Sequence, residues 1–157
     1  MSLGLLIITV IQEQLTFDNY HTEGDRIYRV NTRALRTDGG TESYASVPYG
    51  IGHALKDDYS FAEEVVRFNR RLNADAVYGN VNVPVRGLFA DPSVFRVFNF
   101  PMAKGDPATA LNEPNSLVLT STAAVKIFGD RDPLGQTLTL NGYGEFQVTG
   151  VLQKLPG

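Results

Sequence analysis

Alternation of apolar and polar residues constrains the fold of this chain most strongly. It occurs in three segments, residues 25–36, 64–72 and 81–89. In the first segment Tyr28 and Val30 lie on one face, while arginines occupy the other. A period of two residues predicts β-strands that are covered on one face. The chain is therefore expected to contain a sheet built from short, half-buried strands.

Turn signals separate these strands. Asp38-Gly39-Gly40 predicts a turn, after which residues 42–47 return as a hairpin partner. Asn141-Gly142 predicts a second hairpin turn between the last two strands of the chain. Residues 73–80 contain asparagine, aspartate and glycine and are expected to form a turn. Pro84 assigns its strand to a sheet edge, because proline cannot donate a ladder hydrogen bond.

Capping residues predict short helices between the strands. Asp91 is expected to cap a helix that has Pro92 at its first position. Thr120 or Ser121 is expected to cap another helix, which Gly129 closes. The helices expected in this part of the chain cover residues 48–58, 91–98, 106–111 and 120–129. Brief strands are expected at residues 100–102 and 117–119.

These elements predict a mixed α+β fold of short, mainly antiparallel strands with short helices. The 157 residues fit one domain of ordinary size, which could divide into two subdomains. Hydrophobic residues make up 43% of the chain and charged residues 20%, so a packed core can form.

The N-terminus carries an almost unbroken apolar run at residues 3–11, and a helix is expected over residues 4–21. The run is far shorter than the roughly 20 residues that span a bilayer. It also lacks the basic flank and cleavage site of a signal peptide. Three interpretations stay open: a buried core helix, an interfacial helix, or the end of a transmembrane helix. Residues 1–3 could also derive from an expression vector.

Charge and cysteine content exclude several classes of protein. The net charge of −3 comes with no basic stripe, so nucleic acid is not an expected partner. The arginine clusters lie among acidic residues, which favours solvated strand faces over an anion site. These clusters consist of Arg26, Arg29, Arg33, Arg36, Arg67, Arg70 and Arg71. The absence of cysteine excludes disulfides, thiolate metal sites and cysteine-based catalysis.

No standard catalytic motif occurs in the sequence. It contains neither a P-loop nor the G-x-S-x-G elbow of serine hydrolases. Gly142-Tyr143-Gly144 begins like a dinucleotide motif but falls in the expected hairpin turn. His21 and His53 are too few for a multi-histidine zinc site, and each is expected at the surface or at a cap.

Acidic and aromatic groups have plainer interpretations as well. Asp57-Asp58, Glu63-Glu64 and the pair Asp130 and Asp132 are expected in polar turns, where adjacent carboxylates rarely acquire different pKa values. Asp130-Arg131-Asp132 lacks the spacing of a calcium loop. Four phenylalanines are expected in the core rather than on a carbohydrate platform. They are Phe89, Phe95, Phe98 and Phe100.

Several short motifs, each occurring once, are distributed over nearly the whole chain. Leu15-Thr16-Phe17-Asp18-Asn19-Tyr20-His21 precedes Asp25-Arg26-Ile27-Tyr28-Arg29-Val30, and Phe89-Ala90-Asp91-Pro92 leads into Phe95-Arg96-Val97-Phe98-Asn99-Phe100-Pro101. Further pieces are Pro48-Tyr49-Gly50, Leu117-Val118-Leu119-Thr120, Asp132-Pro133-Leu134-Gly135 and Val148-Thr149-Gly150-Val151-Leu152. Together they resemble the extracytoplasmic core domain of MacB-like and FtsX-like ABC-transporter permeases.

The resemblance implies an organisation for the chain. Residues 1–21 would be the end of a transmembrane or juxtamembrane helix, and residues 22–157 a periplasmic core domain that is truncated at its C-terminal end. Tyr28 and Val30 would lie in a core strand. Gly105 and Gly150 would lie at backbone turns, and Asp91 would cap a helix. Gln14 departs from the family's usual glutamate, and the family normally continues beyond Gly157.

The resemblance also implies a function. The segment would lie on the periplasmic side of the bacterial inner membrane, attached to it by flanking helices. It would relay ATP-driven motion to, or recognise, a periplasmic partner or substrate, with no catalytic, cofactor-binding or metal-binding residue. Its partners would be an ATPase subunit or domain that does not contact this segment, a second permease subunit in a homo- or heterodimer, and a periplasmic adaptor or effector. Alternatives are a secreted or periplasmic module that binds glycan or protein, and a small carboxylate hydrolase.

Overall fold

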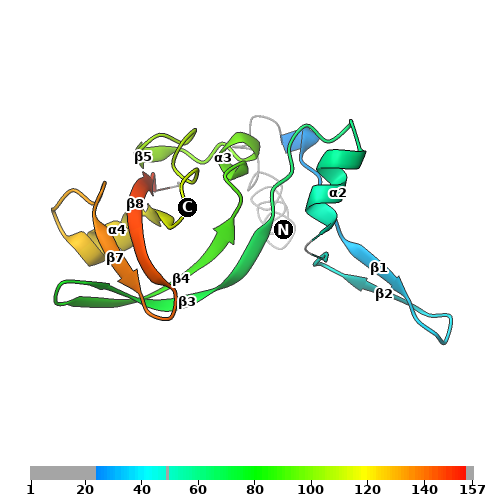
Figure 1. The fold of residues 1–157 in the computed structure, drawn as a ribbon, viewed down its shortest axis with the longest axis horizontal. Helices are drawn as coiled ribbons and strands as arrows, with labels where there is room; N and C mark the ends of the chain where they lie inside the picture. The colour runs from blue at the N-terminus through cyan, green and yellow to red at the C-terminus, as the bar shows by residue number, and fades with distance from the viewer. Residues whose placement is uncertain (1–23, 49, 155–157) are drawn as a thin grey trace, which may run out of the picture. The chain divides into compact units, whose positions relative to one another are not determined.

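The computed structural model describes residues 24–48 and 50–154 of the chain, drawn in colour in Figure 1. The chain divides into two compact units, Met1–Val65 and Val66–Gly157. Both contain short strands and short helices, and the strands pair mostly antiparallel. The predicted α+β class is therefore confirmed. The helix expected over residues 4–21 lies outside the described residues.

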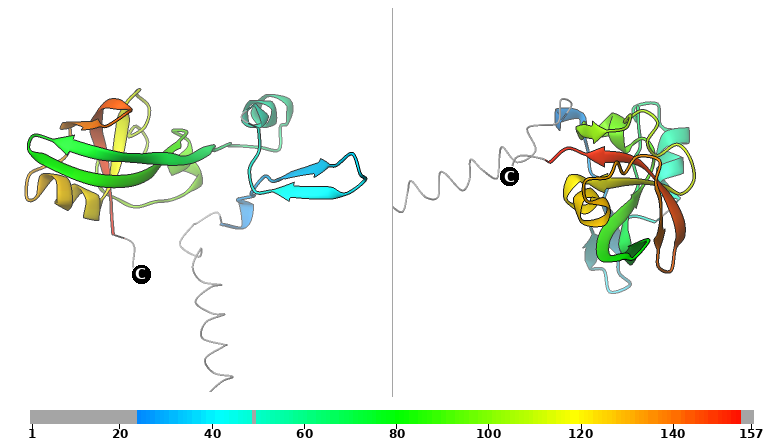
Figure 2. Two further views of the ribbon diagram at one scale, coloured as in Figure 1. Left: turned by 90° about the horizontal axis from the view of Figure 1, so that it is seen from below. Right: turned by 90° about the vertical axis from the view of Figure 1, so that its left-hand side faces the viewer.

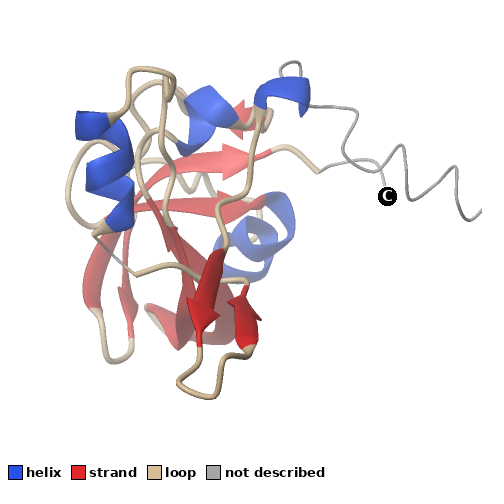
Figure 3. Cartoon of the chain, turned by 90° about the vertical axis from the view of Figure 1, so that its right-hand side faces the viewer, coloured by secondary structure: helices blue, strands red, loops and turns tan. Residues whose placement is uncertain are grey.

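The described part of the first unit contains a two-stranded hairpin and one α-helix of eight residues. Strand β1 (Thr32–Leu35) pairs antiparallel with β2 (Thr41–Tyr44), which Figure 3 shows as two short red arrows. The turn between them forms as predicted, with Arg36 N donating to Gly40 O at 2.8 Å. A 3₁₀ turn, η1 (Gly24–Arg26), precedes the hairpin, and α2 (Ile51–Asp58) follows it. The N-cap of α2 is Gly50, so the helix begins at Ile51, later than the expected start at residue 48.

The predicted strand over residues 25–36 is largely wrong, because only its last third pairs. Tyr28 is 83% exposed and Val30 is 46% exposed, and both precede β1. No described residue of the first unit is buried. Alternation marks side chains suited to one covered face, but a strand also needs a partner for its backbone. Within the described part of this unit, only residues 32–35 of that segment have one.

The second unit is a six-stranded sheet with a helix packed on one face. Its order is β4-β3-β7-β8-β5, and β6 pairs with β8 off this path. The strands are β3 (Phe68–Tyr78), β4 (Val81–Ala90), β5 (Met102–Lys104), β6 (Ser116–Thr120), β7 (Thr137–Leu140) and β8 (Gly144–Leu152). The helices are α3 (Val94–Val97) and α4 (Ser121–Phe128). Figure 2 shows the long β3–β4 hairpin running along the unit.

The β3–β4 hairpin is longer than the sequence predicted. Residues 73–78 continue β3, and the turn is confined to Gly79 and Asn80, where Gly79 has a φ of 57°. The polar residues of this segment do not break the strand, because they alternate with Ala74, Ala76 and Tyr78 on the covered side. Pro84 lies in β4, at the sheet edge, as predicted.

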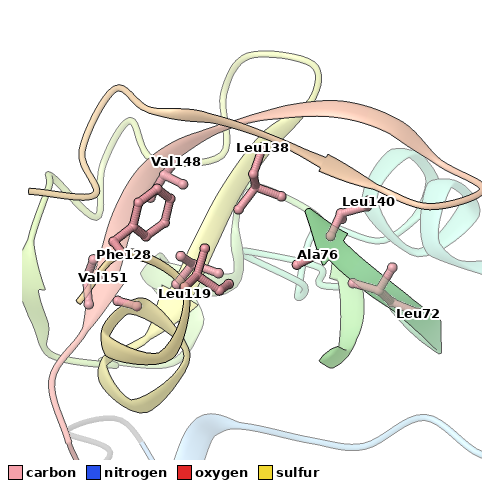
Figure 4. Close-up of a cluster of buried hydrophobic side chains, with 10 residues drawn as sticks. Leu72, Ala76, Leu119, Phe128, Leu138, Leu140, Val148 and Val151 are labelled. Atoms are coloured by element: carbon pink, nitrogen blue, oxygen red, sulfur yellow. The ribbon is translucent and has the colours of Figure 1, made fainter. Parts of the chain in front are cut away.

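Helix α4 closes the hydrophobic core of the second unit. Thr120 caps it by accepting a hydrogen bond from Ala123 N at 3.2 Å, and Gly129 ends it with a φ of 63°. Ile127 and Phe128 are only 1% and 2% exposed, so truncating either to alanine should cost about 2–5 kcal/mol. Figure 4 shows the buried cluster, which consists of Leu72, Ala76, Leu119, Ala124, Ile127, Phe128, Leu138, Leu140, Val148 and Val151.

Two other predicted helices differ in the structure. Residues 107–110 form a turn, in which Ala110 N donates to Asp106 O at 2.9 Å, and do not extend into a helix. Helix α3 begins at Val94 with Ser93 in the N-cap position, so Asp91 is not its cap residue. The Asp91 carboxylate accepts hydrogen bonds from Arg67. The strand expected at residues 100–102 begins instead at Met102.

The two singled-out glycines serve different purposes. Gly105 ends β5 at a bend with a φ of 88°, as predicted. Gly150 is not at a turn: it lies buried within β8, where a Cβ atom would meet the Met102 Cε. At Gly105 the obstacle is backbone and not a flexible side chain, because a Cβ atom there would lie 2.4 Å from Thr149 O. Both glycines therefore permit close contact between β5 and β8.

Gly105→Ala should destabilise the second unit far more than Gly142→Ala. The two glycines have nearly the same φ, 88° and 86°, but a Cβ at Gly142 has nothing within 4 Å. Gly142→Ala should therefore cost about 1–2 kcal/mol from backbone strain alone. Gly105→Ala should cost about 1–3 kcal/mol more, because the clash forces a backbone shift. Urea unfolding followed by circular dichroism measures both, and equal losses would contradict the close contact.

Candidate functional site

The histidines and most acidic residues do not come together in a catalytic arrangement. His53 is exposed on α2, and His21 lies outside the described residues. Asp57 and Asp58 are exposed at the end of α2, and Glu63 forms an ion pair with Arg26 at 2.5 Å. Among the described residues, no three histidine, aspartate or glutamate side chains are grouped to hold a metal ion.

Asp132 forms an exposed ion pair that joins a turn to β5. Its Oδ1 accepts hydrogen bonds from Lys104 Nζ at 3.0 Å and from Leu134 N at 3.2 Å. The hydrogen bond from Lys104 is the main reason that the pKa of the Asp132 carboxyl lies below its ordinary value. This carboxylate therefore stays charged at neutral pH and anchors the turn.

Several clustered arginines lie on solvated faces, as the sequence suggested. The Arg36–Asp38 pair is about 60% exposed on both sides, and Arg29 Nη2 donates to Ala45 O at 2.9 Å. Such exposed pairs contribute at most about 1 kcal/mol. Arg67 is the exception among these residues.

Arg67 and Asp91 form a bidentate pair at the open end of the β3–β4 hairpin. Asp91 Oδ2 accepts from Arg67 Nε at 2.7 Å and from Arg67 N at 3.0 Å, and Oδ1 accepts from Arg67 Nη2 at 2.8 Å. Asp91 N also donates to Arg67 O at 3.3 Å. Both side chains are less than one third exposed. The pair thus continues the ladder by one residue on each strand and fixes where the strands part.

The four phenylalanines do not form the buried core that the sequence predicted. Phe89 is 39% exposed, and the other three are half-buried. Phe98 contacts Phe68 and Phe100, with ring centroids 5.6 and 5.8 Å apart. The buried core lies instead under α4, where ten other residues form the cluster.

A hollow lies at the turn of the β3–β4 hairpin. It has a volume of about 490 Å³ and is lined by Tyr78, Gly79, Asn80, Val81 and Arg131. The Arg131 guanidinium carbon lies 4.9 Å from the centroid of the Tyr78 ring. Sequence reasoning missed this group, because it placed Tyr78 in a turn and considered Arg131 only within a calcium loop.

None of the helices in the described ranges is long and apolar enough to cross a membrane. This finding concerns residues 24–48 and 50–154 only.

Comparison with known proteins identifies relatives of the chain. The family model described as the MacB-like periplasmic core domain matches residues 1–157. A domain of a protein assigned as a permease in Porphyromonas gingivalis is similar in structure, with a TM-score of 0.68 and 20% identity over 80% of this chain and 55% of that one. No curated protein sequence matches the chain.

Two transporter domains are also similar in fold. The extracellular domain of the noncanonic ABC-type transporter YknZ from Gram-positive bacteria has a TM-score of 0.55 and 20% identity, covering 65% of this chain and 55% of that one. The periplasmic region of MacB from Actinobacillus actinomycetemcomitans has a TM-score of 0.53 and 21% identity, covering 66% and 49%. The chain spans about half the length of these solved structures.

Asp91→Asn should weaken the second unit by about 1–3 kcal/mol, because it removes the charge from a partly buried bidentate pair. Lys104→Gln is the matched control, since it breaks an ion pair in the same unit whose side chains are 46% and 64% exposed. Its effect should be clearly smaller. Urea unfolding measures the loss, and amide hydrogen exchange should show faster opening at the Arg67 end of β3. Similar losses in both variants would contradict a special role for the Arg67–Asp91 pair.

Proposed function

The chain belongs to the family of MacB-like periplasmic core domains, and on this premise we propose that it relays ATP-driven motion to, or recognises, a periplasmic partner or substrate. The observation that carries the proposal is the match of the family model over residues 1–157. The similar folds of the YknZ and MacB domains, both from ABC-type transporters, support it.

The proposal assigns the chain a place in a larger assembly. Residues 1–21 would be the end of a transmembrane or juxtamembrane helix, and residues 22–157 the extracytoplasmic core domain of a permease. ATP would be hydrolysed by a separate subunit or domain, and a second permease subunit would complete the transporter. The module itself would perform no catalysis.

The packing of the second unit suits a relay. A part that transmits displacement must resist deformation, and close-packed interiors have low compressibility. Val148 is fully buried between the sheet and α4, and nine other residues pack with it. The Arg67–Asp91 pair fixes one end of the β3–β4 hairpin, and Tyr78 packs on Phe128 near the other. Motion applied at one end of this unit would therefore reach the other end.

A protease site inserted between Gly79 and Asn80 tests the topology. Both residues are exposed in the turn of the hairpin, and a Cβ atom at Gly79 would have nothing within 4 Å. In the full-length protein, protease added outside spheroplasts should cleave there, and the protein should sediment with membranes. Lysed spheroplasts provide the control for cleavability. Cleavage only after lysis, or a protein that stays soluble, would overturn the proposal and favour a secreted binding module.

Spin labels on introduced cysteines test the motion. These 157 residues contain no cysteine, so with any cysteines elsewhere in the full-length protein replaced by serine, Glu145→Cys carries a single label on the exposed end of β8. In the full-length permease with its ATPase, the distance between labels on the two subunits should change between the ATP-free and vanadate-trapped states. The control is a Lys126→Cys and Glu145→Cys pair within one unit, whose distance should stay constant. An unchanged distance between subunits would refute the relay.

A further inference from the structure

We propose that Arg131 and Tyr78 form a binding site for a carboxylate side chain of a protein partner, at the turn of the β3–β4 hairpin. The proposal rests on the proposed function in one respect, since it names the chemistry of the partner that the module would contact. The carboxylate site itself is a property of this chain.

The Arg131 side chain is fixed before any ligand arrives. Its guanidinium lies over the Tyr78 ring at 4.9 Å, within the range of a cation–π contact. Its Nε donates to Phe128 O, 3.2 Å away, at the C-terminal end of α4. Because the side chain is already ordered, binding would cost less of the rotamer entropy that a free arginine loses.

The Tyr78 ring, which supports the guanidinium, is itself held in place by two contacts. Its hydroxyl donates to Gln136 Oε1 at 3.0 Å, and its ring packs against Phe128 with centroids 4.5 Å apart. Phe128 is one of the most deeply buried side chains, with 2% exposure. The guanidinium plane is therefore set by the core of the unit rather than by solvent.

The remaining donors of Arg131 face no acid within the described residues. Only Nε is engaged, in the bond to Phe128 O, which leaves the two terminal nitrogens with four N–H donors. Arg26 and Arg36 do have acidic partners, Glu63 and Asp38. Arg70 and Arg86 are exposed and have no acidic partner in the described part of the chain either, so what distinguishes Arg131 is the tyrosine ring that holds its guanidinium. The side chain thus has positive charge and paired donors that the described fold does not neutralise.

The hollow beside these donors fits a carboxylate better than a phosphate. It measures about 490 Å³ and adds the Asn80 side chain and the apolar Val81 to the rim. A guanidinium binds a planar carboxylate through two parallel hydrogen bonds. A doubly charged phosphate normally needs several cations. Here a single arginine is available, the residue before it in the sequence is the exposed Asp130, and the chain carries a net charge of −3.

A protein partner is favoured over a lipid headgroup for the same reasons. Arginine and tyrosine are the residues that most often dominate protein interfaces. Membrane surfaces attract clusters of lysine and arginine, while this turn has Asn80 and Asn82 beside one arginine. The hairpin turn also lies at the same end of the unit as α4 in both views, so the site is carried by packed elements (Figures 1 and 2).

Binding can be measured on the whole 157-residue chain by NMR. The probe is the blocked peptide acetyl-Gly-Glu-Gly-amide, with acetyl-Gly-Gln-Gly-amide and inorganic phosphate as comparisons. We expect the chemical shifts of the Arg131 Nε–H and Asn80 signals to change with the glutamate peptide and to saturate at millimolar peptide concentrations. Binding of the glutamine peptide should be about tenfold weaker. No saturable shift, or tighter binding of phosphate, would overturn the carboxylate assignment.

Matched variants separate binding from a structural role. Arg131→Lys keeps the charge but loses the planar fork, so affinity for the glutamate peptide should fall about tenfold. Arg70→Gln removes an exposed arginine of β3 that does not line the hollow, so it should leave affinity unchanged. Urea unfolding confirms that each variant folds. Unaltered affinity in a folded Arg131→Lys variant would overturn the proposal.

A photo-cross-linking residue at Asn80 of the full-length protein tests the partner in cells. The cross-linked partner peptide should contain aspartate or glutamate, and its yield should fall at least about tenfold in Arg131→Gln. Cross-links to lipid, or a yield that Arg131→Gln leaves unchanged, would overturn the partner assignment. If the distance between spin labels did not change but the glutamate peptide still bound, the relay proposal would be refuted and the carboxylate site would stand.

Discussion

The backbone ladder of β8 is the constraint on which the second unit depends. This strand pairs with β7, β5 and β6, so it joins every part of the sheet except the β3–β4 hairpin. Its register with β6 shifts at Thr149, whose hydroxyl donates to Ala110 O and also lies 3.3 Å from Leu117 O. Because a bulge changes which face the following residues occupy, both Val148 and Val151 reach the core under α4. Gly105 and Gly150 then allow β5 to close against the same strand.

The β3–β4 hairpin extends the sheet beyond β7 and has a different interaction at each of its ends. At its base, the Arg67–Asp91 pair satisfies the charges of two partly buried side chains. At its turn, Arg131 rests on Tyr78, and the described residues offer it no acid. The first interaction is complete within the fold and serves stability. The second leaves paired donors at the surface, which is the state expected of a residue that binds another molecule.

Local chemistry made much of the second unit predictable. The Thr120 cap, the Gly129 end of α4, the Asn141-Gly142 turn and the edge position of Pro84 each follow from a single residue type. Features that depend on distant contacts were not predictable in this way. The continuation of β3 through residues 73–78 relies on pairing with β4 and β7, and Asp91 is held by Arg67, which is 24 positions away. Tyr28 and Val30 show the same limit, because their alternation indicates a covered face without indicating what covers it.

The motifs that identified the family differ in kind from the residues that would contact a partner. The Leu117–Thr120 and Val148–Leu152 segments form paired strands of the sheet, so they specify how the chain folds. A match through such residues assigns the chain to the family of MacB-like periplasmic core domains. A partner would be selected by surface groups such as Arg131, whose supports Tyr78 and Gln136 are brought together from separate strands and turns. Members of the family could therefore share this core while presenting different chemistry at the hairpin turn.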